Sequence, residues 1–177
     1  MKSFIEQAKV YAHYHQKATT RYTHFVGVPM IVLSLMILCS FLHLSVPGVF
    51  DRTLAEMLTL FVLLYYIVLN WRLGLSVTPV FLLLLWIGHK IGSNGPDATA
   101  LQWFAGLFVI GWIIQLLGHL FEGRRPALTT NLWQAVIAPL FLTAEVYFMC
   151  GKMQPLKEAI APDTDVKEEA SGEEEKP

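Results

Sequence analysis

Apolar residues form long stretches along this chain, and the charged residues fall mostly between them. The clearest stretch is Phe25 to Phe50, which has 26 positions without Asp, Glu, Lys or Arg. Ala98 to Phe121 also lacks these residues and contains a single histidine, His119. A helix needs about 20 apolar residues to cross the hydrocarbon core of a bilayer. Both stretches therefore predict transmembrane helices, and the turn residues Ser45 to Gly48 are expected to end the first. Gly106, Gly111 and Gly118 in the second are expected to pack against another helix.

Two further apolar regions are harder to interpret. Met57 to His89 is divided by Arg72 into two halves of about 15 to 17 residues, each about 23 to 26 Å long as a helix. These halves are predicted to be two short spans that turn at "NWRLG", with a re-entrant hairpin as the alternative. Asn131 to Cys150 predicts a last span, with Glu145 near its far end.

The pattern as a whole predicts an all-α, polytopic membrane helical bundle with five spans, or four in the alternative reading. Residues 1–24 are expected to form an N-terminal interfacial helical segment, and residues 25–151 the bundle. The first 24 residues lack the apolar core of a signal peptide, so the first span is expected to stay in the protein. Residues 152–177 are rich in Glu, Lys, Pro and Ser, and they predict a disordered tail.

Composition agrees with a membrane protein, with 54% hydrophobic and 15% charged residues. Soluble domains average about 25% charged residues. Eight of the 14 acidic residues lie between Glu158 and Glu175, so the rest of the chain is basic overall. No basic face on a soluble scaffold is indicated, which argues against a nucleic-acid partner. The two cysteines, Cys39 and Cys150, both lie in apolar stretches and are not expected to form a disulfide.

Lys and Arg residues indicate the orientation of the spans. With five spans, seven lie on the side of the N-terminus and four on the other side, before the tail. The seven are Lys2, Lys9, Lys17, Arg21, Arg72, Arg124 and Arg125, and the four are Arg52, Lys90, Lys152 and Lys157. Because cytoplasmic segments carry the excess of Lys and Arg, the N-terminus is predicted to face the cytoplasm.

Histidines gather at this predicted cytoplasmic face. His15 and His24 precede or open the first span, and His119 lies near the end of the span from Ala98 to Phe121. On one straight helix His15 and His24 would face opposite ways, because nine residues correspond to about 900° of rotation. A break is therefore required between them, and Thr19 or Thr20 is expected to cap the new helix.

Glu122 follows His119 by three residues, so the two side chains share one helix face. Imidazoles with a carboxylate suit Fe(II), Zn or Mn. The alternative is that these histidines are ordinary amphipathic residues of the membrane interface. His43 and His89 are predicted on the opposite side, away from this group. Glu145 is either a functional intramembrane acid or a side chain that snorkels to the surface.

The same stretches resemble a known family. The pattern Y-x3-H-x8-H-x2-G-x-P begins at Tyr11, and GW-x2-Q-x2-GH-x2-EG-x2-PA begins at Gly111. In this order they are similar to the small membrane family typified by the fungal endoplasmic-reticulum 2-hydroxy fatty acid dioxygenase, over roughly residues 5 to 150. The resemblance implies an Fe(II)-dependent dioxygenase that shortens a 2-hydroxy fatty acid by one carbon, using O2. The carboxyl end would react at the interface, and the tail is expected to stay in the bilayer.

The resemblance also implies roles for particular residues. His15, His24 and His119 become the expected iron ligands, Glu122 a ligand or base beside the metal, and Arg124 or Arg125 the partner of the substrate carboxylate. One position departs from the family, which usually has Asn where this chain has Thr20. Localisation would be the inner membrane in a bacterium or the endoplasmic reticulum in a eukaryote. The competing hypothesis is a non-catalytic membrane protein that binds lipid or acts as a scaffold.

Overall fold

The computed structural model describes residues 4–14, 17–48, 50–122 and 133–161. These residues form seven helices and one two-stranded hairpin, so the predicted all-α class is confirmed, with a small β addition. The elements are α1 (Phe4–Tyr14), α2 (Ala18–Ser40), β1 (His43–Val46), β2 (Phe50–Thr53), α3 (Leu54–Leu69), α4 (Trp71–Gly92), α5 (Ala98–Glu122), α6 (Trp133–Met149) and α7 (Gln154–Ile160).

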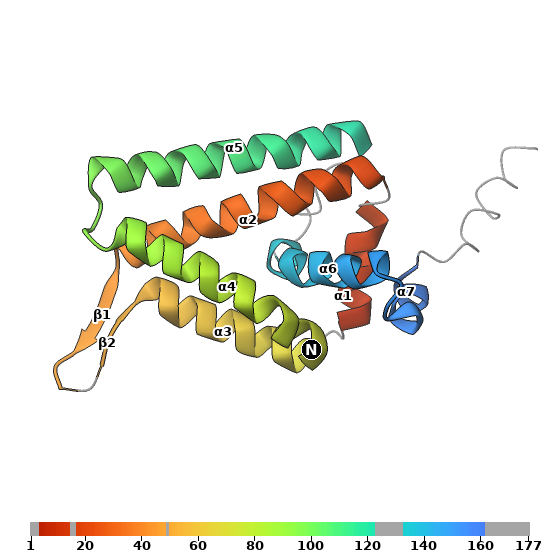
Figure 1. Cartoon of the computed structure of the whole chain (residues 1–177), viewed down its shortest axis with the longest axis horizontal. Helices are drawn as coiled ribbons and strands as arrows, with labels where there is room; N and C mark the ends of the chain where they lie inside the picture. Colours follow the sequence, from red (N-terminus) through yellow and green to blue (C-terminus); the bar gives the residue numbers. More distant parts are fainter. Residues whose placement is uncertain (1–3, 15–16, 49, 123–132, 162–177) are drawn as a thin grey trace, which may run out of the picture.

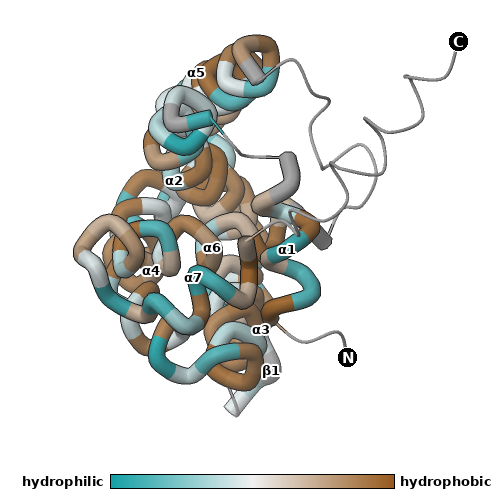
Figure 2. Tube along the Cα trace, turned by 90° about the vertical axis from the view of Figure 1, so that its right-hand side faces the viewer, coloured by the Kyte–Doolittle hydropathy of each residue, from teal (hydrophilic) through white to brown (hydrophobic). Residues whose placement is uncertain are grey.

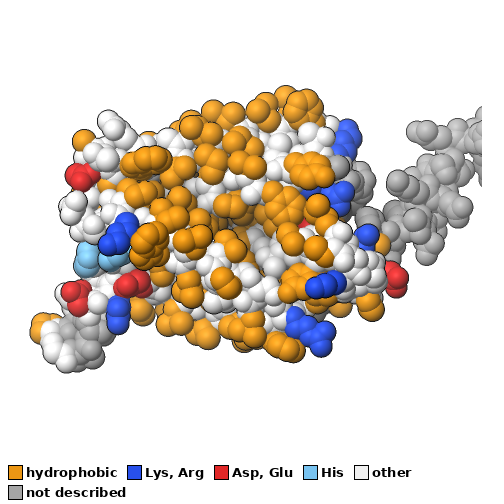
Figure 3. Space-filling model, in the orientation of Figure 1, with side chains coloured by type: hydrophobic (Ala, Val, Ile, Leu, Met, Phe, Trp, Pro, Cys, Tyr) orange, Lys and Arg blue, Asp and Glu red, His pale blue; other side chains and the backbone are white. Residues whose placement is uncertain are grey.

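The long helices α2, α3, α4 and α5 run lengthwise through the molecule (Figure 1). We call the end that holds the hairpin and the α4–α5 turn the hairpin end, and the end that holds α1, α7 and the α3–α4 turn the site end. In the described residues, three helices are long and apolar enough to cross a membrane: Thr19–Ser40, Trp71–Gly92 and Ala98–Phe121. Leu54–Leu69 and Ala135–Met149 are apolar but shorter. An apolar belt covers the visible face between the two ends (Figure 3), which supports membrane association.

The first span is shorter than predicted. The helix stops at Ser40, and residues 43–53 form an antiparallel hairpin in which His43 pairs with Thr53. Pro47 and Gly48 lie at its tip, and Gly48 has a φ of 76°, which favours glycine. Thr53 then begins α3 with a capping box, because its hydroxyl accepts from the Glu56 N–H and its own N–H donates to the Glu56 carboxylate. This hairpin was not predicted, because β1 carries no charge and so continues the apolar stretch of the span, although β2 contains Asp51 and Arg52.

The turn predicted within Met57 to His89 is confirmed. Helix α3 ends at Leu69, and α4 begins at Trp71 after the single residue Asn70. The Asn70 side chain accepts from the Leu73 N–H at 3.3 Å and caps α4. A Cβ at Gly74 would lie 2.7 Å from the Ile67 backbone nitrogen, so only glycine lets the two helices approach this closely.

Helix α6 runs from the middle of the molecule to the site end and does not reach the hairpin end (Figure 1). Its 17 residues correspond to about 25 Å. Helix α7 then packs on α1, so both lie at one end, as seen when that end faces the viewer (Figure 2). The helices that run between the two ends are therefore α2, α3, α4 and α5, and the number of membrane spans stays a prediction. Residues 154–160 of the predicted disordered tail are helical, and residues 162–177 lie outside the described residues.

Candidate functional site

His24 and His119 lie side by side at the site end, one on α2 and one on α5. Their ring centroids are 5.0 Å apart, and the rings meet edge to face at 86°. Both side chains are buried, with 3% and 7% of their surface exposed. We call these two residues the histidine pair. The sequence analysis expected them to meet at one membrane face, and the structure brings them together although 95 positions separate them.

The histidine pair depends on an unusually close approach of α2 and α5. A Cβ at Gly118 would lie 2.1 Å from the Thr23 hydroxyl oxygen, and a Cβ at Gly27 would lie 2.7 Å from Gln115 Cγ. Gly111 is similarly tight against Ile31. Small residues let helices in membranes pack backbone to backbone. The sequence analysis assigned helix packing to Gly106, Gly111 and Gly118. The last two are confirmed, whereas a Cβ at Gly106 would meet no atom within 4 Å.

This contact yields a first prediction. Replacing Gly118 by alanine is expected to force α2 and α5 apart and to lower the free energy of unfolding by about 1 to 2 kcal/mol, the usual cost of overpacking. Thermal unfolding of the protein in detergent would measure the change. Gly106→Ala is the matched control on the same helix, because open space surrounds the added methyl group. Equal melting temperatures for the two variants would contradict the assigned contact.

The orientation of the His24 ring is set by its own helix. Its Nδ1 lies 2.7 Å from the carbonyl oxygen of Thr20. A carbonyl can only accept, so Nδ1 carries the proton and a neutral His24 has its lone pair on Nε2. Histidines that bind metals usually donate their other N–H to a carbonyl or carboxylate in this way. His24 is therefore presented in the tautomer that coordinates through Nε2.

The break before α2 exists, but Thr20 does not cap it. Helix α2 begins at Ala18 after Lys17, whose side chain makes no cap hydrogen bond. Thr20 is fully buried in the first turn, and its hydroxyl donates to the Gly118 carbonyl at 3.0 Å. The prediction of a threonine cap was wrong because this hydroxyl ties α2 to α5. Lys17 Nζ reaches the Phe121 carbonyl at 2.7 Å, which adds a positive charge at the C-terminus of α5.

A partly buried ion pair lies about one helix turn from His24. Glu145 on α6 is 8% exposed, and its Oε2 lies 2.9 Å from Arg21 Nη1 on α2. From the sequence, Glu145 is either a functional acid or a side chain that snorkels to the surface, and Arg21 only helps to indicate the orientation of the spans. In the structure these two side chains form an ion pair with each other. The available signal was that Arg21 lies three residues before His24, on the same helix face.

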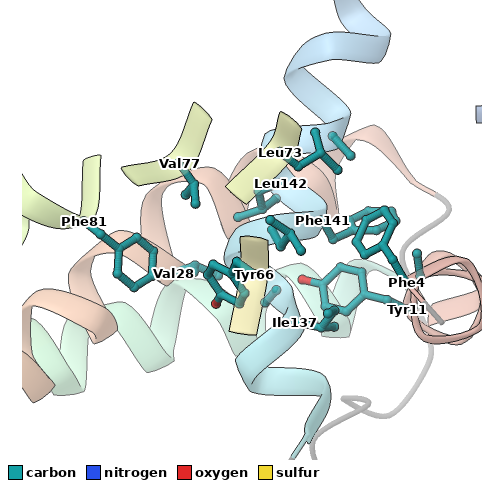
Figure 4. Close-up of a cluster of buried hydrophobic side chains, with 14 of the residues drawn as sticks. Phe4, Tyr11, Val28, Tyr66, Leu73, Val77, Phe81, Ile137, Phe141 and Leu142 are labelled. Atoms are coloured by element: carbon teal, nitrogen blue, oxygen red, sulfur yellow. The ribbon is translucent and has the colours of Figure 1, made fainter. Parts of the chain in front are cut away.

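Tyr11, on α1, lies beside His24 and Phe141 in the interior. The residue is 3% exposed, and its ring centroid lies 6.4 Å from that of His24 and 4.5 Å from that of Phe141. Its side chain points from α1 into the interior beside Ile137 (Figure 4). Burial, and then the negative charge of Glu145, raises the pKa of the Tyr11 phenol above its ordinary value. The phenol therefore stays protonated and can act as a hydrogen-bond donor at physiological pH.

Several predicted site residues lie outside the described residues. These are His15, Arg124 and Arg125, together with the side chain of Glu122, whose backbone ends α5. Within the described ranges, no group of three or more His, Cys, Asp or Glu residues could hold a metal. His43 and His89 are exposed at the hairpin end, away from the histidine pair, as expected. The ligand roles of His15, His24 and His119 remain predictions.

An apolar cavity of about 290 Å³ extends into the bundle from His119, the member of the histidine pair that lines it. His119, Gln115 and Tyr11 line one end, and Cys39 and Ala55 line the other. Its walls come from α2, α3, α5 and the first turns of α6, with Phe81 from α4. Apolar cavities with a few polar groups at one end are typical of small-molecule sites. The arrangement therefore places His119 and Tyr11 in the wall of an apolar cavity, with the His24 ring next to both.

Comparisons with known proteins give two similarities. Residues 1–150 match the family model described as "Mpo1-like: 2-hydroxy-palmitic acid dioxygenase Mpo1-like". The chain is 35% identical over 166 residues to the 2-hydroxy-palmitic acid dioxygenase MPO1 of Saccharomyces cerevisiae, which covers 92% of this chain and 90% of that protein. No solved structure gave a significant match.

Proposed function

Because the chain belongs to the Mpo1-like family of 2-hydroxy-palmitic acid dioxygenases, we propose that it is an iron(II)-dependent dioxygenase of 2-hydroxy fatty acids. The substrate would be shortened by one carbon in an α-oxidation step. The observation that carries the proposal is the buried histidine pair, of which His119 lines the polar end of an apolar cavity. The alternative is a membrane lipid-binding or scaffold protein, in which the imidazoles serve only as hydrogen-bonding groups.

The donor chemistry of the pair fits iron. Two imidazoles that share one ion through metal–nitrogen bonds of about 2 Å bring their rings into close contact, as these are at 5.0 Å between centroids. The Thr20 carbonyl sets His24 to coordinate through Nε2. His24 and His119 would hold the ion, with His15 and Glu122 as the proposed further ligands. When bound, iron would activate O2, which otherwise reacts slowly with spin-paired organic substrates.

The reaction balances without an outside reductant. The hydroxyl-bearing carbon becomes the new carboxyl group and the bond between C1 and C2 breaks, so that one 2-hydroxy acid and one O2 give the shorter acid, CO2 and water. The four electrons lost by the two carbons reduce one O2. Arg124 or Arg125 is proposed to bind the substrate carboxylate, because a guanidinium matches it with two hydrogen bonds. The protonated phenol of Tyr11 would donate a hydrogen bond beside the histidine pair.

We place the site end in the cytoplasm. Of the described Lys and Arg residues, six belong to this end and two to the hairpin end. The six are Lys9, Lys17, Arg21, Arg72, Lys152 and Lys157, and the two are Arg52 and Lys90. Lys152 and Lys157 were predicted on the opposite side, and the packing of α7 on α1 moves them to this end. The bias is therefore stronger than the sequence alone indicated.

Turnover of a defined substrate tests the proposal. Purified protein with Fe(II), O2 and 2-hydroxypalmitate is expected to release the fifteen-carbon acid, consuming one O2 for each acid formed. Palmitate, which lacks the 2-hydroxyl, serves as the matched control and should not react. A protein that contains bound iron and leaves 2-hydroxypalmitate unchanged would favour the lipid-binding alternative instead.

A further inference from the structure

The cavity beside the histidine pair has the dimensions of a lipid chain. Along α2 its lining begins at Val28, one turn after His24, and continues to Cys39 near the hairpin end. These 11 steps correspond to about 16 Å of helix axis. The hydrocarbon core of a bilayer is about 30 Å thick, so the cavity is as long as the hydrocarbon of one leaflet.

The two ends of the cavity differ in chemistry. His119, Gln115 and Tyr11 give polar groups to the site end. The far end is formed by Cys39 and Ala55, whose small side chains do not fill the cavity there. Between the ends the walls are almost wholly aliphatic or aromatic. An amphiphile with a polar head and one saturated chain therefore fits in a single direction, with its head at the histidine pair.

The cavity is also continuous with the lipid-facing surface. Leu35, Leu58 and Leu116 line it and are at the same time 43%, 45% and 50% exposed. These residues come from α2, α3 and α5, so the cavity opens between helices at exposed apolar side chains. The acyl chain of a lipid in the bilayer can therefore enter the cavity sideways, without passing through water.

We propose that this cavity holds the acyl chain of the substrate, and that the side chains at its far end set the longest chain accepted. This inference rests on the proposed function for the identity of the head group. It replaces the expectation from the sequence that the tail remains in the bilayer. Cys39 and Ala55 then determine specificity, and Thr59, one turn nearer the histidine pair on α3, marks a shallower level about 6 Å away.

Two substitutions at different depths test this assignment. Cys39→Phe fills the far end, and Thr59→Leu narrows the cavity at the shallower level. The detergent-solubilised full chain would be equilibrated with an equal mixture of saturated fatty acids from decanoate to arachidate. Native mass spectrometry then reports which acids stay bound. These acids lack the 2-hydroxyl, so the measurement does not depend on turnover.

Cys39→Phe is expected to deplete the longest bound acids at least about tenfold, which corresponds to about two methylene groups excluded from the cavity. Decanoate binding should stay within about twofold. Thr59→Leu should lower the limit further, to shorter chains. Leu38→Phe is the matched control, because Leu38 is next to Cys39, does not line the cavity and is 37% exposed. Its profile should equal that of the wild type.

An unchanged chain-length profile in both cavity variants would overturn the assignment, and so would an equal loss of all chain lengths from variants that remain folded. A graded shift without turnover of any 2-hydroxy acid would support the cavity and contradict the dioxygenase. Turnover by the wild type with the same chain-length limit in all variants would contradict the cavity alone. The two proposals therefore fail separately.

Discussion

Replacing either member of the histidine pair by alanine should lower turnover of 2-hydroxypalmitate by more than about 100-fold. Loss of a residue that merely orients a metal ligand costs about 10- to 100-fold, and loss of a ligand should exceed that. The experiment compares kcat of His24→Ala and His119→Ala with the wild type, under saturating Fe(II) and O2.

His89→Ala is the control for this prediction, because His89 is an exposed histidine at the hairpin end. It should keep full activity. Thermal unfolding of each variant separates chemistry from folding, since His24 and His119 are both buried. Folded His24→Ala or His119→Ala protein with near-normal turnover would remove the basis for the proposed site.

The ion pair between Arg21 and Glu145 should make an asymmetric contribution to stability. The Glu145 side chain is 11% exposed and that of Arg21 39% exposed. Arg21→Met leaves a buried carboxylate without its cation, and we expect the free energy of unfolding to fall by about 2 to 3 kcal/mol. This is below the cost for a fully buried pair, because solvent reaches Arg21. Glu145→Gln leaves the guanidinium near solvent and should cost less than about 1 kcal/mol.

The double variant tests the pairing itself. If the two side chains interact mainly with each other, Arg21→Met in the Glu145→Gln background should add little further loss, giving a coupling free energy close to the loss from Arg21→Met alone, about 2 to 3 kcal/mol. Melting temperatures of the four proteins in one detergent provide the cycle. Additive losses would show that Arg21 and Glu145 act independently.

The helices could be predicted because their signals are local. Charge-free stretches of sufficient length give α2 and α5, and Arg72, which divides an apolar region at "NWRLG", gives the turn between α3 and α4. Gly111 and Gly118 were correctly assigned to helix packing because they interrupt a helix that has no other need of glycine. Each of these inferences needs only the residues within one segment.

The remaining features depend on contacts that no single segment contains. Glu145 finds its partner 124 residues away, so its role could not be derived from the composition of its own span. Thr20 was expected to cap α2, but α5 lies close enough to accept its hydroxyl. The apolar composition of α6 is that of a membrane span. Its position in the bundle, however, depends on the helices against which it packs.

The iron content of the purified protein tests the central claim most directly, namely that α2 and α5 hold one metal ion between His24 and His119. Wild type and His89→Ala, reconstituted anaerobically with Fe(II) and freed of excess metal, should each contain about one iron per chain, because a mononuclear site is proposed. His24→Ala and His119→Ala should both contain almost none. Equal iron in all four proteins, or none in the wild type, would contradict the account.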